Sequence, residues 1–364
     1  MLVEHLKRLQ PLCPVCRNAG REPSTLRLGT VAKSDGEDVI EGVLLCPALL
    51  CQHEHPIIDG IPVVVADIAS WAAHQMPGLL RRDDLSAFAE SLLGDAAGPG
   101  SDLDRERTNL GIYGWAHWGD FAPEAGQGHG GAYAELLQAA LSIQGTPASG
   151  PWLDLGCSVG RGTLELARRG ADLAIGVDLN FAMLRIAERA RRSGRAVFPL
   201  RRGGIVFDRI DAPLGAVPRE RMGYWCCDVS LLPFTDGFFA GALLLNLLDC
   251  VTAPLGLLSE SARVLTAGAR ALFSSPYDWS ANATPASQWL GGHSQRNDSH
   301  GDSATELRRI LSTDCAAGID TGFIIDAERD AVPWHLRTGE RSTMAYAVHL
   351  ATLQRKSASP GTKS

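Results

Sequence analysis

The sequence lacks any run of about 18 consecutive apolar residues, so we expect no transmembrane helix and no membrane partner. Its first residues, MLVEHLKRLQPLCPVC, lack the apolar core of a secretory signal, and we therefore expect a cytoplasmic protein. A framework of disulfides is not expected either, because the cysteine count of nine is odd and no export signal is evident.

An excess of basic residues is also missing. Asp and Glu number 41 against 34 Lys and Arg, which gives a net charge of -7. Affinity for nucleic acids comes largely from Lys and Arg contacts to phosphate, so this balance argues against a nucleic-acid partner and favours a small-molecule substrate. The one dense basic stretch spans residues 189–202, and such stretches are usually solvated helix faces or loops.

Four cysteines near the start of the chain form two pairs. Cys13 and Cys16 are separated by two residues, and Cys46 and Cys51 by four. Two such pairs, about 30 residues apart, can place four thiolates around one tetrahedral zinc. Two histidines beside the second pair are able to replace one cysteine: His53 and His55. The alternative interpretation is four buried thiols without metal.

The spacing of apolar residues divides the chain into four predicted parts. Residues 1–68 form a small cysteine-containing domain, and a domain of this size often needs a metal or another staple. Residues 69–130 form a linker that has the potential to act as a lid, residues 131–354 an α/β domain, and residues 355–364 a flexible tail.

The predicted linker shows no sustained hydrophobic period, and glycine-rich breakers occur at residues 94–100 and 126–131. Residues 111–119 hold a dense aromatic cluster that is not expected to lie in solvent. Two placements are open: the cluster packs on the cysteine-containing domain, or it covers the active site.

From residue 151 the sequence alternates apolar strands with amphipathic helices, which is typical of an α/β sheet. A buried strand at 152–155 leads into a glycine-rich turn, and a second strand at 173–177 ends at Asp178. Glycines let the backbone approach a nucleotide-like ligand, and free N–H groups at a helix start bind anions. Asp178 follows Gly156 by 178 − 156 = 22 residues. That is close to the spacing of about 20 expected for an acid that binds ribose hydroxyls.

The turn reads G-x-x-x-G-x-G rather than the G-x-G-x-x-G of nicotinamide enzymes, and Asp154 precedes it. Residues 153–162, LDLGCSVGRG, resemble motif I of class I S-adenosylmethionine-dependent methyltransferases. The resemblance implies a Rossmann-like sheet of seven strands and S-adenosylmethionine as the cofactor. It places these residues at the cofactor: Asp154, Gly156, Cys157, Gly160, Gly162, Asp178, Leu179, Asp228, Val229 and Asn246.

Later segments agree with that pattern. The third strand, at residues 224–227, ends in Asp228, which by resemblance accepts a hydrogen bond from the adenine amino group, with Val229 beside the ring. Strand four spans 239–245, with Asn246 at its carboxyl end, where ligands bind in open α/β sheets. Three further strands are expected at 269–273, 323–325 and 343–350. A long insertion at 194–221 is either a loop near the substrate or an oligomer contact, and the oligomeric state stays open.

Two segments bear on the substrate. Residues 275–280 and 332–341 resemble the methyltransferase part of ovothiol-synthesis enzymes, which methylate a thiohistidine imidazole nitrogen, and more distantly carnosine N-methyltransferases. The resemblance implies a small imidazole- or amine-bearing, amino-acid-like substrate.

Five residues are the candidates for binding that substrate. Polar contacts are expected from three of them: Asp278, Tyr277 and Asp249. Arg337 and Arg341 are expected to clamp a carboxylate, although each is equally well interpreted as an exposed ion pair.

The cysteine-containing domain also resembles a known type. Residues 45–62 are similar to the small zinc-ribbon-like domains that activate tRNA and translation-factor methyltransferases and that occur fused to bacterial methyltransferases. In that family the second cysteine pair is usually C-x2-C, whereas here four residues intervene. The resemblance implies a structural zinc. It also leaves open an alternative function, a ribosomal or transfer RNA methyltransferase that docks RNA or protein through this domain.

Overall fold

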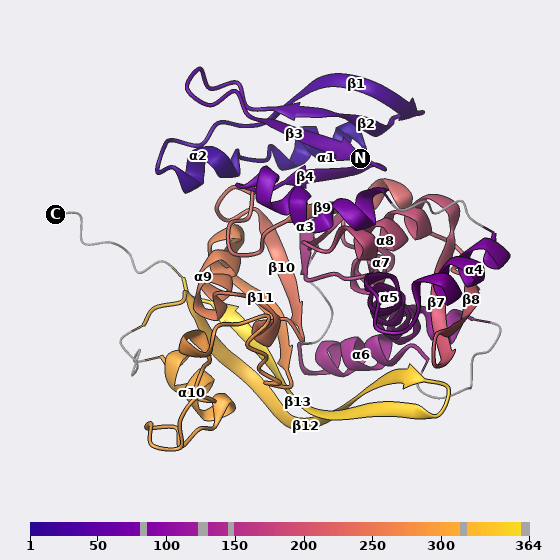
Figure 1. Ribbon diagram of the computed structural model, residues 1–364. Coiled ribbons are helices and arrows are strands. Elements are labelled where there is room, and N and C mark those ends of the chain that lie inside the picture. Colours follow the sequence, from indigo (N-terminus) through magenta and orange to yellow (C-terminus); the bar gives the residue numbers. More distant parts are fainter. Residues whose placement is uncertain (81–85, 123–129, 145–148, 314–318, 358–364) are drawn as a thin grey trace.

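The computed structural model describes residues 1–80, 86–122, 130–144, 149–313 and 319–357. A twisted sheet of eleven strands crosses these parts of the molecule, and helices cover both of its faces (Figure 1). The strand order is β1-β2-β3-β4-β9-β6-β5-β10-β11-β13-β12.

Seven of the strands come from the predicted α/β domain. Their bounds are β5 (Pro151–Leu155), β6 (Leu173–Asp178), β9 (Met222–Cys227), β10 (Phe239–Leu245), β11 (Leu265–Ser275), β12 (Phe323–Gly339) and β13 (Ser342–Arg355). The first five are parallel, and β13 runs antiparallel between β11 and β12. These central strands are almost wholly buried, because helices cover both faces, and they read as near-continuous apolar runs.

The sheet exceeds the predicted seven strands because the N-terminal segment extends it. Four strands come from that segment: β1 (Arg27–Asp35), β2 (Asp38–Leu45), β3 (Glu54–Ile58) and β4 (Ile61–Val64). These four strands pair antiparallel in chain order. Strand β4 then pairs with β9 in parallel, with Val63 opposite Cys226. The prediction of a seven-stranded sheet is corrected to eleven strands, with the cysteine-containing segment hydrogen-bonded to the edge of the α/β sheet.

Two layers of helices bury the sheet. One apolar core packs beneath α3 (Ile68–Leu80), α5 (Asp102–Trp118), α6 (Ala132–Gln144), α7 (Arg161–Arg168) and α8 (Phe181–Ser193). The other packs beneath α1 (Val3–Leu9), α9 (Pro254–Val264) and α10 (Ser303–Ile310). Shorter or peripheral helices are α2 (Pro14–Asn18), α4 (Ala87–Ala97), and the 3-10 turns η1 (Gly119–Phe121), η2 (Arg219–Arg221), η3 (Leu248–Cys250) and η4 (Ala286–Gln288). In the described part of the chain, no helix is both long enough and apolar enough to cross a bilayer.

The predicted linker folds into α3, α4 and α5 where it is described. Helix α5 carries the aromatic cluster, and Trp115 and Trp118 are buried at 0% and 1% exposure. Its aromatics pack on the α/β part rather than on the cysteine-containing segment. Trp118 donates its indole N–H to Val159 O at 3.0 Å, and the His117 ring stacks on Tyr133 with centroids 4.1 Å apart.

The insertion at 194–221 forms a hairpin of β7 (Arg195–Gly203) and β8 (Val206–Pro213) that lies against α5 (Figure 1). The two glycines of α5 permit this approach. A Cβ at Gly111 would lie 2.5 Å from Pro199 O, and one at Gly114 would lie 2.5 Å from the Phe198 ring. The insertion is therefore part of the packed structure around α5.

Candidate active site

The glycine-rich turn joins β5 to α7 in a conformation that its sequence explains. Gly156 and Gly160 have φ angles of 68° and 93°, which L side chains rarely adopt. Ser158, between them, also has a positive φ of 51°, and its N–H donates to Asp178 Oδ2 at 2.9 Å. Tyr224 donates its hydroxyl to Gly160 O at 2.9 Å. The turn is thus held by contacts with β6 and β9, which lie next to each other on one side of β5.

Gly162 and Asp154 pack together beneath the turn. A Cβ at Gly162 would lie 2.6 Å from both Asp154 Oδ2 and the Tyr133 hydroxyl oxygen, so only glycine fits. Asp154 is 1% exposed and accepts a hydrogen bond from Thr163 Oγ1 at 2.8 Å. Burial raises the pKa of Asp154 to about 7. Asp154 therefore orients the start of α7, and Cys157 is buried close by.

Asp178 ends β6 where the sequence predicted it. Its two carboxylate oxygens accept N–H groups from Ser158 at 2.9 Å and Asn180 at 2.8 Å. Burial raises its pKa despite these donors. A carboxylate has about four lone-pair sites, so both oxygens keep capacity for further donors such as ribose hydroxyls. The next residue, Leu179, is 42% exposed and leaves an apolar surface beside this acid.

Asp228 and Val229 follow β9, the neighbour of β6 in the sheet. Asp228 accepts the N–H of Ser230 at 2.8 Å, which fixes its carboxylate at the strand end. Val229 is buried at 7% exposure. Because parallel strands share their carboxyl edge, Asp178 and Asp228 lie at the same edge as the turn.

Asn246 follows β10 in a left-handed conformation, with φ of 52°. Its side-chain oxygen accepts the Ser274 hydroxyl at 2.7 Å. Its Nδ2 is buried and lacks a hydrogen-bond partner among the described residues. A buried donor without a partner costs about 1–3 kcal/mol, which indicates a place where a ligand acceptor is expected.

Two acidic residues lie together beyond the ends of β10 and β11. Asp249, 3% exposed, accepts the Asp278 N–H at 2.7 Å and the Ser275 hydroxyl at 3.4 Å. Burial raises the pKa of Asp249. Asp278 is exposed and accepts the Tyr346 hydroxyl at 3.0 Å. The structure thus brings Asp249 and Asp278 together with Tyr346, which sequence reasoning missed because no motif marks this strand position.

A family model described as a methyltransferase domain matches residues 153–273 of this chain. The matched segment contains the glycine-rich turn and the ends of β6, β9 and β10. The protein is an S-adenosylmethionine-dependent methyltransferase.

Solved structures similar to the methyltransferase share little sequence with it. An S-adenosylmethionine-dependent methyltransferase from Methanosarcina mazei has 23% identity and a TM-score of 0.37, covering 57% of this chain and 92% of its own. Phosphoethanolamine N-methyltransferase 2 of Haemonchus contortus, solved with S-adenosyl-L-methionine, has 19% identity and a TM-score of 0.37, covering 63% and 45%. The [4+2]-cyclase SpnF has 15% identity and a TM-score of 0.43, covering 74% and 97%. No curated protein sequence matches the chain.

Tyr277 of the methyltransferase does not join the carboxylate pair through its side chain. Its hydroxyl lies 2.7 Å from His349 Nδ1, and His349 Nε2 lies 2.8 Å from Glu328 Oε2. The ring packs with the core beneath α9 and α10, on the other face of the sheet from α5. Tyr277 therefore holds the loop that presents Asp278.

The two candidate arginines lie on the β12–β13 hairpin. Arg337 is 8% exposed, and its guanidinium lies 4.7 Å from the centre of the Trp115 ring on α5. Arg341 is exposed in the hairpin turn after β12. The structure thus separates the roles of the two: Arg337 is a packing partner of α5, and Arg341 faces solvent.

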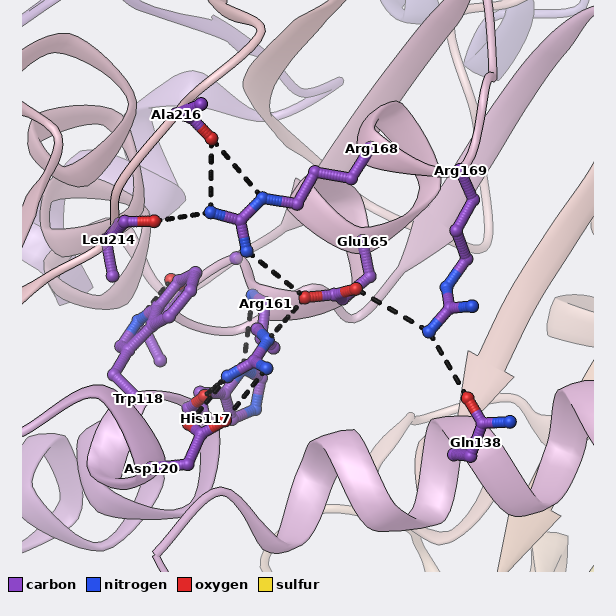
Figure 2. Close-up of polar contacts among 12 residues, drawn as sticks. His117, Trp118, Asp120, Gln138, Arg161, Glu165, Arg168, Arg169, Leu214 and Ala216 are labelled. Atoms are coloured by element: carbon purple, nitrogen blue, oxygen red, sulfur yellow. Dashed lines mark hydrogen bonds and ion pairs between the residues drawn. The ribbon is translucent and has the colours of Figure 1, made fainter. Parts of the chain in front are cut away.

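Sequence reasoning also missed Arg161, which lies inside the glycine-rich turn. It forms a bidentate pair with Asp120 at 2.7 and 3.0 Å and donates to His117 O at 2.7 Å and Glu165 Oε1 at 3.0 Å (Figure 2). Its side chain is 6% exposed. The arginine therefore fastens the end of α5 over the start of α7. Its position in G-R-G was the only sequence signal.

Glu165 extends this network. Besides Arg161, it pairs with Arg168 and Arg169, which continue to Leu214 O and to Gln138 (Figure 2). The network connects α7 to the end of the hairpin insertion and to α6. The segments that flank the glycine-rich turn are thus tied together by charge-assisted hydrogen bonds.

The four predicted zinc ligands of the methyltransferase lie together. The sulfurs of Cys13, Cys16, Cys46 and Cys51 are all within 4.8 Å of one another. Cys13 and Cys51 are 3.8 Å apart, and Cys16 and Cys46 are 3.7 Å apart. Tetrahedral zinc with Zn–S bonds of about 2.3 Å requires sulfurs about 3.8 Å apart, so the donor set fits this metal.

Proposed function

We propose that the methyltransferase binds S-adenosylmethionine along the carboxyl ends of β5, β6, β9 and β10. Asp178 accepts hydrogen bonds from the ribose hydroxyls, and Asp228 accepts one from the adenine amino group beside Val229. The glycine-rich turn from Gly156 to Gly162 lies against the methionine carboxylate. The positive φ angles of the turn and the lone-pair capacity of Asp178 support this placement.

We further propose that the methyl acceptor is an amine or imidazole nitrogen of a small molecule. The observation that carries this is the pair Asp249 and Asp278: the Asp249 carboxylate accepts the Asp278 N–H, and the Asp278 carboxylate accepts the Tyr346 hydroxyl. Carboxylates attract a protonated amine or imidazole and orient it, because opposite charges interact strongly where water is partly excluded.

S-adenosylmethionine supplies an electrophilic methyl group on a sulfonium. The acceptor nitrogen lone pair forms the new N–C bond as the C–S bond breaks, and the positive charge moves from sulfur to nitrogen. The protein mainly holds the nitrogen on the methyl axis, and orientation can contribute about 7–11 kcal/mol. Because the acceptor binds in its protonated form, it must first lose a proton. Asp249, whose pKa is raised by burial, takes this proton and thereby frees the nitrogen lone pair for attack.

We propose no substrate carboxylate contact from Arg337, because its guanidinium packs on Trp115. The amino-acid-like character of the substrate then depends on the carboxylate pair, which recognises its amine or imidazole. The alternative is an RNA substrate docked through the cysteine-containing segment. The exposed acidic residue at the strand ends, Asp278, favours a cation over a polyanion.

The deciding experiment is transfer of labelled methyl groups to a panel of histidine, thiohistidines, histidine dipeptides, small amines, thiols and total RNA. We expect label in an amine or imidazole acceptor. In Asp278→Asn, kcat/KM for that acceptor is expected to fall at least about 30-fold, because at least one charge-assisted contact is lost. Arg341→Gln is the matched control and is expected to retain activity. Label that appears only in RNA would contradict the proposal and support the alternative.

Cofactor placement has its own test. Asp178→Ala removes two ribose hydrogen bonds, which is expected to cost about 2–4 kcal/mol, or roughly 30- to 1,000-fold in affinity. Calorimetry with S-adenosylmethionine measures this directly. Unchanged cofactor affinity in that variant would reject the placement of the site.

We also propose that the four cysteines hold one structural zinc. The thiolates would then connect α2, which contains Cys16, to the residues that follow β2. Elemental analysis of protein purified without added metal is expected to give about one zinc per chain. A zinc content near zero would leave four buried thiols.

A further inference from the structure

A cavity of about 890 Å³ lies between α4, α5, α8 and the β7–β8 hairpin. None of the residues that line it belongs to the cofactor or substrate site proposed above. Its volume falls within the range of about 300–1,000 Å³ that is usual for small-molecule sites. The predicted linker and the insertion form most of its walls.

One part of the cavity wall is apolar. Leu103 and Leu110 line it from α5, Ile186 from α8, and Phe198 from β7. Leu93 on α4 also lines it and is 49% exposed. When a ligand covers such exposed apolar surface, the burial contributes about 25 cal/mol of favourable binding free energy per Å². The wall therefore suits the apolar body of a ligand.

The rest of the wall is basic. Two carboxylates line the cavity, Asp35 and Glu90. Six arginines line it as well: Arg107, Arg185, Arg189, Arg192, Arg195 and Arg209.

The two lining carboxylates form ion pairs with lining arginines that a ligand is able to replace. Arg192 pairs with Asp35 at 2.8 Å, and Arg209 pairs with Glu90 at 3.9 Å. In the first pair the side chains of Arg192 and Asp35 are 32% and 73% exposed. In the second pair those of Arg209 and Glu90 are 41% and 34% exposed. Such partly exposed pairs contribute little, about 0–1 kcal/mol, so an incoming anion is able to take the place of a carboxylate.

We propose that this cavity is a second binding site, which takes a small amphipathic anion: a single-chain carboxylate with an apolar tail. The tail covers the apolar wall on α5, α8 and β7. The carboxylate lies among the arginines, whose planar guanidinium groups match its two oxygens. A cavity between helices fits a single chain, whereas a flat basic surface would fit a bilayer.

Calorimetric titration with decanoate tests the proposal, with decyltrimethylammonium as the cationic control of equal chain length. We expect saturable binding of about one decanoate per chain, and much weaker binding of the cation. Saturating S-adenosylhomocysteine is expected to leave decanoate binding in place, because the two sites share no residue.

Two variants and one matched control complete the test. Arg189→Gln removes a guanidinium from the wall and is expected to weaken decanoate binding about 10-fold or more. Leu93→Trp fills the apolar part from a half-exposed position and is expected to abolish binding. Arg27→Gln removes an equal charge from exposed β1 and is expected to leave binding unchanged. Melting curves show that each variant folds. No saturable decanoate binding, equal binding of the cation, or unchanged affinity in both cavity variants would overturn the proposal.

Discussion

Arg161 offers the sharpest test of how α5 is held over the glycine-rich turn. Replacing it with Met keeps the apolar stem and removes the guanidinium, which contacts Asp120, His117 O and Glu165. Breaking a buried ion pair from one side costs about 3–5 kcal/mol. The Asp120 side chain is 36% exposed and regains water, and Glu165 keeps Arg168 and Arg169. We therefore expect a smaller loss, about 2–3 kcal/mol of unfolding free energy.

A double-mutant cycle isolates the ion pair. Urea unfolding is measured for Arg161→Met, Asp120→Ala and the combined variant. Because the two side chains share two hydrogen bonds, the combined variant is expected to lose less unfolding free energy than the two single variants added together. The difference is expected to be about 1–2 kcal/mol. Arg169→Met, at the residue that follows α7, is the matched control. The Arg169 side chain is 39% exposed, and its pair with Glu165 is expected to contribute less than about 1 kcal/mol.

Cofactor affinity provides the second readout. Since Arg161 lies within the turn and connects α5 to α7, S-adenosylmethionine should bind Arg161→Met at least about 10-fold more weakly, as expected when about 1.4 kcal/mol of positioning is lost. Strictly additive free energies together with unchanged cofactor affinity would refute the argument that this network positions the turn.

Three further predictions concern single positions. Gly162→Ala places a Cβ 2.6 Å from Asp154 Oδ2, so it should lower both the melting temperature and cofactor affinity, whereas Gly203→Ala, with no atom within 4 Å, should not. The raised pKa of Asp154, about 7, means that its protonated form is favoured in the folded state. The contribution of Asp154 to the free energy of unfolding is therefore largest below the unfolded pKa of about 3.9, and it falls as the pH rises to about 7. In unfolding curves measured from pH 4 to 8, Asp154→Asn should remove this pH-dependent fall in stability. Tyr277→Phe, which takes the hydroxyl from His349, should cost about 1–2 kcal/mol of stability yet retain most turnover; a loss of kcat as large as that of Asp278→Asn would make Tyr277 a substrate contact.

The strands that carry the cofactor site were predictable because their signals are local. Strand β10 has the predicted bounds of 239–245, and β6 ends at Asp178 as expected, since runs of buried apolar residues end at turn or acidic residues. The glycine-rich turn also follows from its own residues. Tight turns and positive φ angles are properties of a few neighbouring positions, so a short sequence contains most of the information.

Other features depend on residues far apart in the chain. Pairing of β4 with β9 joins positions about 160 residues apart, and nothing in either strand specifies that partner. Arg337 lay in a segment that resembled a substrate contact, yet β12 continues as a strand to Gly339 and brings the guanidinium onto Trp115. The helices of the predicted linker were missed because α5 is covered on several sides and shows no single apolar stripe.

Through the same long-range strand pairing, the proposed zinc is expected to affect the affinity for the cofactor. The cysteine cluster fixes the end of β2, the hairpins carry that order through β3 to β4, and β4 pairs with β9 one residue before Asp228. If zinc is bound, its removal by a chelator should therefore loosen the edge that positions Asp228 as well as lower the melting temperature. We expect S-adenosylmethionine affinity to fall about 3- to 10-fold, less than one hydrogen bond to a charged group is worth, and to recover when zinc is restored. A lower melting temperature with unchanged cofactor affinity would show that the added strands stabilise the sheet without positioning the site.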